Sequence, residues 1–148
     1  MVNIDFSTVQ LQLKKEQDKV YVFDIVRRKW LILTPEEHVR QSVLYYLINT
    51  IKYPKGLLAV EKKIMVSGLA KRFDIVVYES SSHTPWMLIE CKAHEVSITQ
   101  ATLHQLLSYH NQLQCNYWVL TNGHETYCAD ATQQNNIEWI DKLPFYNF

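Results

Sequence analysis

The sequence predicts an α/β protein with a mixed central β-sheet flanked by helices and an N-terminal β-hairpin or meander. Three observations lead to this fold class. Several short segments are rich in β-branched and aromatic residues and are bounded by turn signals. Two longer segments, 35–52 and 99–114, carry apolar residues at helical spacing. The second helix lies between two strand-like segments, 86–93 and 116–121, and such a crossover returns the chain parallel to the first strand.

The N-terminal part is predicted to contain the β-hairpin or meander, followed by the first helix. In residues 7–14 and 19–33, apolar residues either alternate with polar ones or follow one another directly, and Asp18 marks a turn between the two segments. Thr34 is the predicted N-cap of the helix over 35–52, because a threonine followed by proline is typical of a helix start. The apolar stripe of this helix comprises Val39, Val43, Leu44, Leu47, Ile48 and Ile51.

A strand-rich region with one further helix is predicted to follow. That helix covers residues 99–114 and is opened by Ser97, with Gln100 three residues later. Asn122 and Gly123 predict a hairpin between the last two strands. The predicted strands are 57–66, 72–79, 86–93, 116–121 and 125–130.

Length and composition fit one compact domain. The chain has 148 residues, 47% of them hydrophobic, with three glycines and four prolines. We divide it into an N-terminal β extension (1–33), a core (34–130) and a tail (131–148), in which residues 137–148 form a short helix or an edge strand.

The cellular placement expected from the sequence is cytoplasmic. No apolar run is long enough to span a bilayer, and the N-terminus lacks the features of a signal peptide. The cysteines are three and widely spaced, so we expect buried free thiols at Cys91, Cys115 and Cys128.

Two acids and a lysine are predicted to converge in the hairpin between residues 71 and 92. An antiparallel register across this hairpin pairs Asp74 with Glu90, and cross-strand partners have Cβ atoms roughly 4.5 to 5.5 Å apart. Glu90 and Lys92 share a face because side chains alternate along a strand. The three side chains therefore form one candidate cluster.

The two carboxylates of this cluster need a counter-charge, because they repel by roughly 3 kcal/mol at an effective dielectric constant near 20. A divalent cation removes this penalty. Carboxylate oxygens suit Mg²⁺, which usually takes one or two protein carboxylates together with substrate phosphate oxygens and water. Lys92 would then lie beside the attacking water or the scissile phosphate, as in a metal-dependent nuclease site. The alternative is a structural salt bridge between Glu90 and Lys92 at a strand end.

The order of motifs between residues 34 and 128 favours the nuclease site over the structural salt bridge. Asp74 is followed by the acid-x-Lys strand 90–92, and then by a helix with Gln105 and Tyr109 in Q-x-x-x-Y spacing. This order resembles the PD-(D/E)xK nuclease superfamily, and more closely the N-terminal nuclease domain of the R (motor) subunit of type I restriction enzymes. The segments that carry the resemblance, over about two thirds of the chain, are TPEEHVRQ, YPKGLLAVEKKI, RFDIVVY, LIECKA, QLLSY and YWVLTNGHETYC.

The resemblance implies a restriction endonuclease-like core and a metal site that uses Mg²⁺ or Mn²⁺. By this resemblance, Asp74 and Glu90 bind the metal, and the main-chain carbonyl of Cys91 completes the protein ligands. Lys92 orients or activates the attacking water and offsets charge on the phosphate. Phe73 stands where the superfamily's name-giving proline would precede the acid, a position that is loosely kept.

The resemblance also implies site residues on the two helices. Gln105 and Tyr109 lie one helical turn apart, so one helix face can direct both toward the site or the DNA backbone. The family places an acid on its first core helix, where this chain has Glu36 and Glu37. Glu37 is at position N3 and is predicted to complete a capping box with Thr34, which leaves Glu36 for the site. Glu36 is equally compatible with a solvated acid near the positive end of the helix dipole.

The charge balance predicts weak DNA binding by this chain alone. The 15 basic and 15 acidic residues cancel, whereas most nonspecific DNA affinity comes from neutralising phosphates. Because no helicase segment follows the core, we expect a helicase, translocase or specificity subunit encoded separately to deliver the DNA. No membrane partner is expected, and homodimerisation is left open. The candidate DNA-binding residues are basic and close to the first acid in sequence: Lys62, Lys63, Lys71 and Arg72.

Two classes of function are open at this stage. The first is metal-dependent hydrolysis of DNA phosphodiesters, in restriction, defence or repair and together with partner proteins. The second is a noncatalytic module that binds nucleic acid or protein on the same fold. A small structural domain, whose acids pair with lysine and arginine, is a weaker third class. Asp74, Glu90 and Lys92 are all present, which favours the nuclease.

Overall fold

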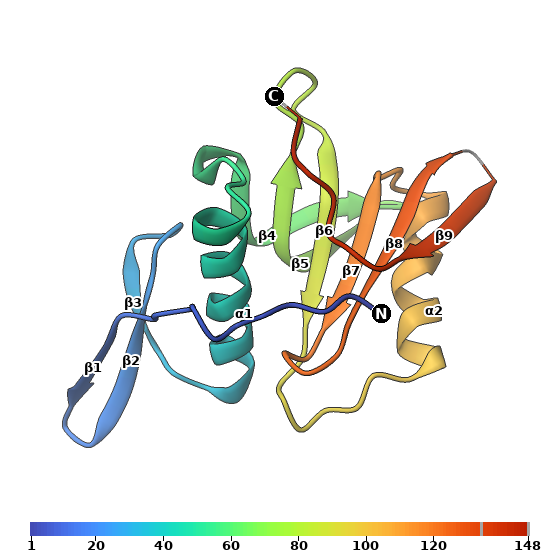
Figure 1. Cartoon of the computed structure of the whole chain (residues 1–148). Helices are drawn as coiled ribbons and strands as arrows, with labels where there is room; N and C mark the ends of the chain where they lie inside the picture. Colours follow the sequence, from blue (N-terminus) through green and yellow to red (C-terminus); the bar gives the residue numbers. More distant parts are fainter. Residues whose placement is uncertain (134, 148) are drawn as a thin grey trace.

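A six-stranded mixed sheet with one helix on each face forms the core of the molecule (Figure 1). The computed structural model describes residues 1–133 and 135–147. The strands are β4 (Leu58–Val66), β5 (Leu69–Tyr78), β6 (Pro85–Cys91), β7 (Tyr117–Thr121), β8 (Thr126–Gln133) and β9 (Asn136–Ile140). They are hydrogen-bonded in this order, and β6 and β7 run parallel whereas the other described pairs are antiparallel. The predicted fold class is confirmed.

The parallel return from β6 to β7 passes through helix α2 (Gln100–Ser108) and the 3₁₀ turn η3 (Tyr109–Asn111). The N-cap of α2 is Thr99, not Ser97 as predicted. The Thr99 hydroxyl accepts from the Thr102 N–H, and the Thr102 hydroxyl accepts from the Thr99 N–H. Because this reciprocal pair satisfies two N–H groups of the first turn, the helix starts there and Ser97 stays outside it.

Helix α1 (Pro35–Tyr45) covers the opposite face of the sheet and continues as the π-helical turn η1 (Tyr46–Thr50). Its predicted N-cap is confirmed, since the Thr34 hydroxyl accepts from the Glu37 N–H at 3.1 Å. The helical hydrogen bonds end with η1, where the Ile51 N–H donates to the Tyr46 carbonyl, so the helix stops before Pro54 and near the predicted position. A short 3₁₀ turn, η2 (Lys55–Leu57), then leads into β4.

Each helix packs on its own set of strand side chains, and this arrangement fixes which residues can meet at each face. Val39 and Val43 of α1 pack with Ile75 and Ile89. The cluster on the α2 face contains Phe73, Val76, Leu88, Leu103, Leu106, Trp118, Leu120 and Ala129. Glu90 follows Leu88 by two positions, so the alternation of β6 directs it to the α2 face.

The N-terminal segment forms a separate three-stranded antiparallel meander beside α1, as Figure 1 shows. Its strands are β1 (Leu13–Glu16), β2 (Lys19–Asp24) and β3 (Lys29–Ile32). The strand predicted over 7–14 is wrong for its first six residues. Ile4 and Phe6, just before this part of the chain, pack against the α1-side core. The pairing of β1 with β2 begins at Leu13, preceded by one hydrogen bond from the Phe23 N–H to the Gln12 carbonyl.

The predicted hairpin and the predicted edge strand are both present in the C-terminal part of the chain. The hairpin between β7 and β8 turns through Asn122, whose side chain accepts from the main-chain N–H groups of His124 and Glu125. Of the two forms predicted for residues 137–148, the edge strand is present as β9. The three cysteines are buried free thiols, as expected. No helix in the described ranges is long and apolar enough to cross a membrane.

Candidate active site

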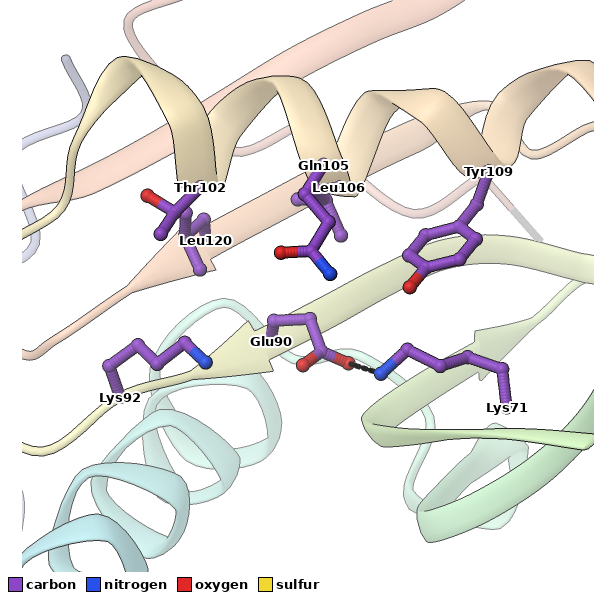
Figure 2. A pocket seen from close by; sticks show the side chains of 8 residues that line it. All are labelled: Lys71, Glu90, Lys92, Thr102, Gln105, Leu106, Tyr109 and Leu120. Atoms are coloured by element: carbon purple, nitrogen blue, oxygen red, sulfur yellow. Dashed lines mark ion pairs between the residues drawn. The ribbon is translucent and has the colours of Figure 1, made fainter.

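A small pocket between the end of β6 and helix α2 collects four of the predicted catalytic residues and one predicted DNA-binding residue, Lys71 (Figure 2). Glu90 and Lys92 come from the end of β6, and Gln105 and Tyr109 point toward Glu90 from the helix above. The cavity has a volume of about 80 Å³. Lys71, Thr102, Leu106 and Leu120 complete its lining.

The ion pair in this pocket joins Glu90 to Lys71. The Lys71 Nζ lies 3.7 Å from the Glu90 Oε1, which is buried and has no hydrogen-bond partner among the described residues. The alternative of a salt bridge between Glu90 and Lys92 is not formed in the part of the chain that the structure describes. Lys92 is instead anchored through its main-chain N–H, which donates to the Thr121 carbonyl at 2.8 Å.

The electrostatic surroundings of Glu90 hold its carboxyl group near the middle of its titration at neutral pH. Burial raises the pKa of Glu90 most strongly, and the nearby charge of Asp74 raises it further, to about 7. Lys71 and Lys92 lower it in part. A buried carboxylate with these neighbours gains from a cation close to its free oxygen.

Asp74 lies where the ladder between β4 and β5 is interrupted. Val60 pairs with Ile75 and Lys62 with Phe73, whereas the intervening Glu61 has a φ of +53° and no pairing with Asp74 is formed. The side-chain alternation breaks at the same point, because Phe73 and Val76 both belong to the α2-side cluster. This irregularity turns the side chain of Asp74 away from its regular direction.

The carboxylate of Asp74 therefore lies at the junction of β5, β6 and α1. Its Oδ2 accepts from the Cys91 N–H at 2.8 Å, and its Oδ1 accepts from the Arg40 Nη2 at 2.8 Å. Among the described residues, the antiparallel pairing of β5 with β6 ends at Ile75 opposite Ile89, one position before the predicted partners Asp74 and Glu90. The two acids approach from different directions, however, because Asp74 turns toward α1 and Glu90 toward α2.

Arg40 is the centre of a buried charge network that includes Asp74. Its side chain is 7% exposed, and its guanidinium contacts Glu37 at 2.7 Å and Glu61 at 3.5 Å. Burial lowers the pKa of Arg40, but its hydrogen bond to Asp74 and the surrounding carboxylates outweigh burial, so the pKa is raised. Arg40 therefore stays charged and fixes one oxygen of Asp74.

This network corrects the role predicted for Glu37. Half of the capping box is present, because the Thr34 hydroxyl accepts from the Glu37 N–H. The Glu37 carboxylate does not return to Thr34; it accepts from Arg40 and from the Gln41 Nε2, at 3.0 Å for the latter. A buried guanidinium is a stronger hydrogen-bond partner for a carboxylate than an exposed N–H group, so the Glu37 side chain bonds to Arg40 instead of to Thr34.

Glu36 reaches the candidate site through Arg40. Its side chain is 52% exposed and lies 3.4 Å from the Arg40 Nη2. The described residues that line the pocket include none from α1, because α1 and α2 cover opposite faces of the sheet.

The four predicted DNA-binding residues lie on two faces of the β4–β5 hairpin. Lys62 pairs with Phe73, which packs on the α2 side, and so it shares that face with Lys71. Lys63 pairs with Arg72, and alternation places both on the opposite face.

Sequence reasoning missed Arg40, Arg27 and Glu61 as members of the network. Arg27 bonds to Asp24 and Glu61, at 2.7 and 3.2 Å, and so connects the N-terminal meander to β4. The one available signal was the spacing of Glu36 and Arg40, four residues apart on a helix. The contacts to Glu61 span more than 20 residues of sequence, and no local pattern encodes them.

The side chains that could serve as metal ligands at this site are two carboxylates rather than a larger cluster. Within residues 1–133 and 135–147, no group of three or more His, Cys, Asp or Glu side chains is arranged to hold an ion. The free Glu90 Oε1 and the adjacent Asp74 are oxygen donors, and oxygen donors with water are the set that Mg²⁺ takes. The residues present therefore fit a hard divalent cation and do not fit zinc.

Comparison with known proteins adds an independent line of evidence. The model of the type I restriction enzyme R protein N terminus (HSDR_N) matches residues 35–144, which include α1, the pocket and the strands from β4 to β9. A search of curated proteins found no match. Because the match covers most of the chain, the protein belongs to the family of type I restriction enzyme R protein N-terminal domains.

Proposed function

We propose that this protein hydrolyses DNA phosphodiester bonds with a divalent metal ion, Mg²⁺ or Mn²⁺, at the pocket around Glu90. One observation carries the proposal: a buried carboxylate oxygen without a hydrogen-bond partner lies beside a second acid and in one pocket with Lys92. Family membership supports a restriction-related nuclease role.

Asp74 and Glu90 would hold the ion, with the main-chain carbonyl of Cys91 as a further oxygen ligand. When bound, such an ion supplies a Lewis acid for the phosphoryl oxygen and lowers the pKa of water. The Cys91 N–H and Arg40 fix the carboxylate of Asp74, so this ligand is oriented in advance. Preorganisation of this kind reduces the cost of assembling a site during the reaction.

The remaining pocket residues have roles in positioning the substrate. Lys92 directs its ammonium group at the attacking water or the scissile phosphate, whose growing negative charge it stabilises. Gln105 and Tyr109 contribute an amide and a phenol that can donate hydrogen bonds to phosphate oxygens or orient the water. Glu36 is exposed next to Arg40 and acts on Asp74 through that guanidinium.

DNA is the proposed substrate, and a helicase, translocase or specificity subunit is the proposed means of delivery. The chain has no net charge, so phosphate neutralisation gives it little affinity of its own.

A noncatalytic DNA- or protein-binding module is the second candidate. It is favoured by the cationic partners that both acids have within the protein, Arg40 for Asp74 and Lys71 for Glu90. A binding module needs these ion pairs to persist, whereas a nuclease needs metal to enter beside them.

The test is cleavage of supercoiled and linear DNA by wild type and Lys92→Ala, with Mg²⁺, Mn²⁺ or a chelator. We expect metal-dependent nicking or degradation that falls by about 100-fold or more in Lys92→Ala, as for loss of a group that stabilises transition-state charge. Lys15→Ala, at an exposed position on β1, is the charge-matched control. Cleavage by Lys92→Ala at the wild-type rate rejects the mechanism.

Calorimetry separates the two candidates without relying on turnover. The nuclease predicts that wild type binds one Mn²⁺ per chain in the presence of DNA, and that Asp74→Asn and Glu90→Gln each remove this binding. Absence of metal uptake by wild type, with and without DNA, favours the binding module.

A further inference from the structure

Lys71 lies on the opposite side of Glu90 from Lys92, as Figure 2 shows. It comes from β5, and its ammonium group is 3.7 Å from the Glu90 Oε1. The Glu90 side chain is 16% exposed and the Lys71 side chain 33% exposed. The lysine thus approaches a buried carboxylate from the solvent side of the pocket.

The contact between Lys71 and Glu90 is electrostatic rather than a hydrogen bond. Glu90 Oε1 has no hydrogen-bond partner among the described residues, and Lys71 Nζ instead donates to the Arg72 carbonyl at 3.1 Å. The ammonium also lies over the rings of Phe73 and Tyr109, at 5.2 and 5.7 Å from their centroids. The ammonium therefore has a main-chain carbonyl and two aromatic rings as partners besides the carboxylate.

Asp74 provides the contrast within the same site. Its partner Arg40 is 7% exposed and bonds at 2.8 Å, so this pair is buried and rigid. This buried bond orients Asp74, and the Arg40 side chain has little solvent exposure through which to move away when another cation approaches. Of the two cations paired with the candidate metal ligands, Lys71 is the one with solvent access and a long flexible stem.

We propose that Lys71 is a displaceable counter-ion of Glu90, which competes with the divalent metal for that carboxylate and moves to a DNA phosphate when the metal binds. This inference rests on the proposed metal site. A lysine beside a divalent cation is repelled, whereas a phosphate in the same pocket attracts it. Metal and DNA binding are then coupled, and the coupling is reciprocal.

The experiment measures Mn²⁺ affinity by calorimetry at pH 8, with and without a phosphorothioate duplex that resists hydrolysis. At this pH the Glu90 carboxyl, whose pKa is about 7, is largely ionised. Lys71→Met should bind Mn²⁺ about tenfold more tightly than wild type in the free protein. The gain in Mn²⁺ affinity caused by DNA should be about tenfold smaller in Lys71→Met than in wild type.

Two further variants separate charge from packing. Lys71→Arg keeps the charge and should retain the wild-type Mn²⁺ affinity, and Lys71→Gln provides a second neutral variant should Lys71→Met fold poorly by circular dichroism. Lys15→Met removes the same charge from β1, far from the pocket in sequence, and should leave the affinity unchanged.

The possible outcomes distinguish this inference from the function on which it rests. Equal Mn²⁺ affinity of wild type and both neutral variants in the free protein overturns the counter-ion role while leaving the metal site in place. No Mn²⁺ binding by wild type in either condition overturns the metal site itself.

Discussion

The surroundings of Glu90 shift the pKa of its carboxyl group far from the ordinary value of a glutamate. A glutamate ordinarily titrates near pH 4.5, yet burial and the neighbouring Asp74 raise the pKa of Glu90 to about 7. Such a shift is typical of functional carboxylates, because burying a charge for no purpose is unfavourable. The same shift makes folding stability depend on pH.

The free energy of unfolding should fall as pH rises from about 5 to 8. Between the unfolded-state and folded-state pKa values, the folded protein retains a proton at Glu90 that the unfolded chain has lost, so raising the pH favours unfolding. Because one pKa unit corresponds to 1.36 kcal/mol, the titration of Glu90 changes the free energy of unfolding by up to about 3 kcal/mol. Urea unfolding of metal-free protein at pH 5 and pH 8 measures it.

Glu90→Gln should remove this contribution and be more stable than wild type at pH 8, because the amide needs no ionisation. Glu16→Gln, at an exposed acid on β1, should keep the wild-type difference between the two pH values. An equal difference in Glu90→Gln and wild type would place the pH dependence elsewhere in the molecule.

At the scale of elements, turn chemistry decides how the ends of the strands meet. The β7–β8 hairpin closes at Gly123, where φ is +88° and a Cβ would lie 2.5 Å from the Cε1 of His94. His94 in turn lies in the loop after β6, 3.3 Å from the His38 Nδ1 on α1. One glycine thus permits close contact of three elements near the Lys92 end of the site.

Gly123→Ala should therefore destabilise the protein by about 1 to 3 kcal/mol, from backbone strain at positive φ together with the displacement of His94. Gly56→Ala is the matched control, since a Cβ there meets nothing within 4 Å. Chemical denaturation of both variants tests this, and equal stability of the two would show that the hairpin rearranges without cost.

At the scale of the whole molecule, charge is balanced overall but divided between faces of the β4–β5 hairpin. Lys62 and Lys71 lie on the face of the pocket, and Lys63 and Arg72 on the opposite face. DNA that enters the pocket can contact the first pair without reaching the second. Because basic and acidic residues balance, the chain has no net positive charge to attract DNA in addition.

Lys62→Met should therefore weaken DNA binding and reduce the slope of log affinity against log salt by about 0.9, the value for one phosphate contact. Lys63→Met removes the same charge from the opposite face and should leave the slope as in wild type. Fluorescence anisotropy over a salt series measures both, and an effect of Lys63→Met equal to that of Lys62→Met would contradict this assignment of faces.

The sequence by itself determined the order of the elements and the candidate residues on them. The helix cap at Thr34, the hairpin at Asn122 and the crossover before β7 follow from local patterns, because hydrophobic periodicity and turn chemistry act over a few residues. Alternation along one strand likewise placed Glu90 and Lys92 on one face, and helical spacing aligned Gln105 with Tyr109.

Only the tertiary structure decided how those residues are partnered. The direction of Asp74 depends on an interrupted ladder at Glu61, and its partner Arg40 comes from a helix 34 residues earlier. Lys71 rather than Lys92 pairs with Glu90. Strand register, irregular backbone and burial bring these groups together across long sequence separations, and the electrostatic energies that select among them depend on distances that no local pattern specifies.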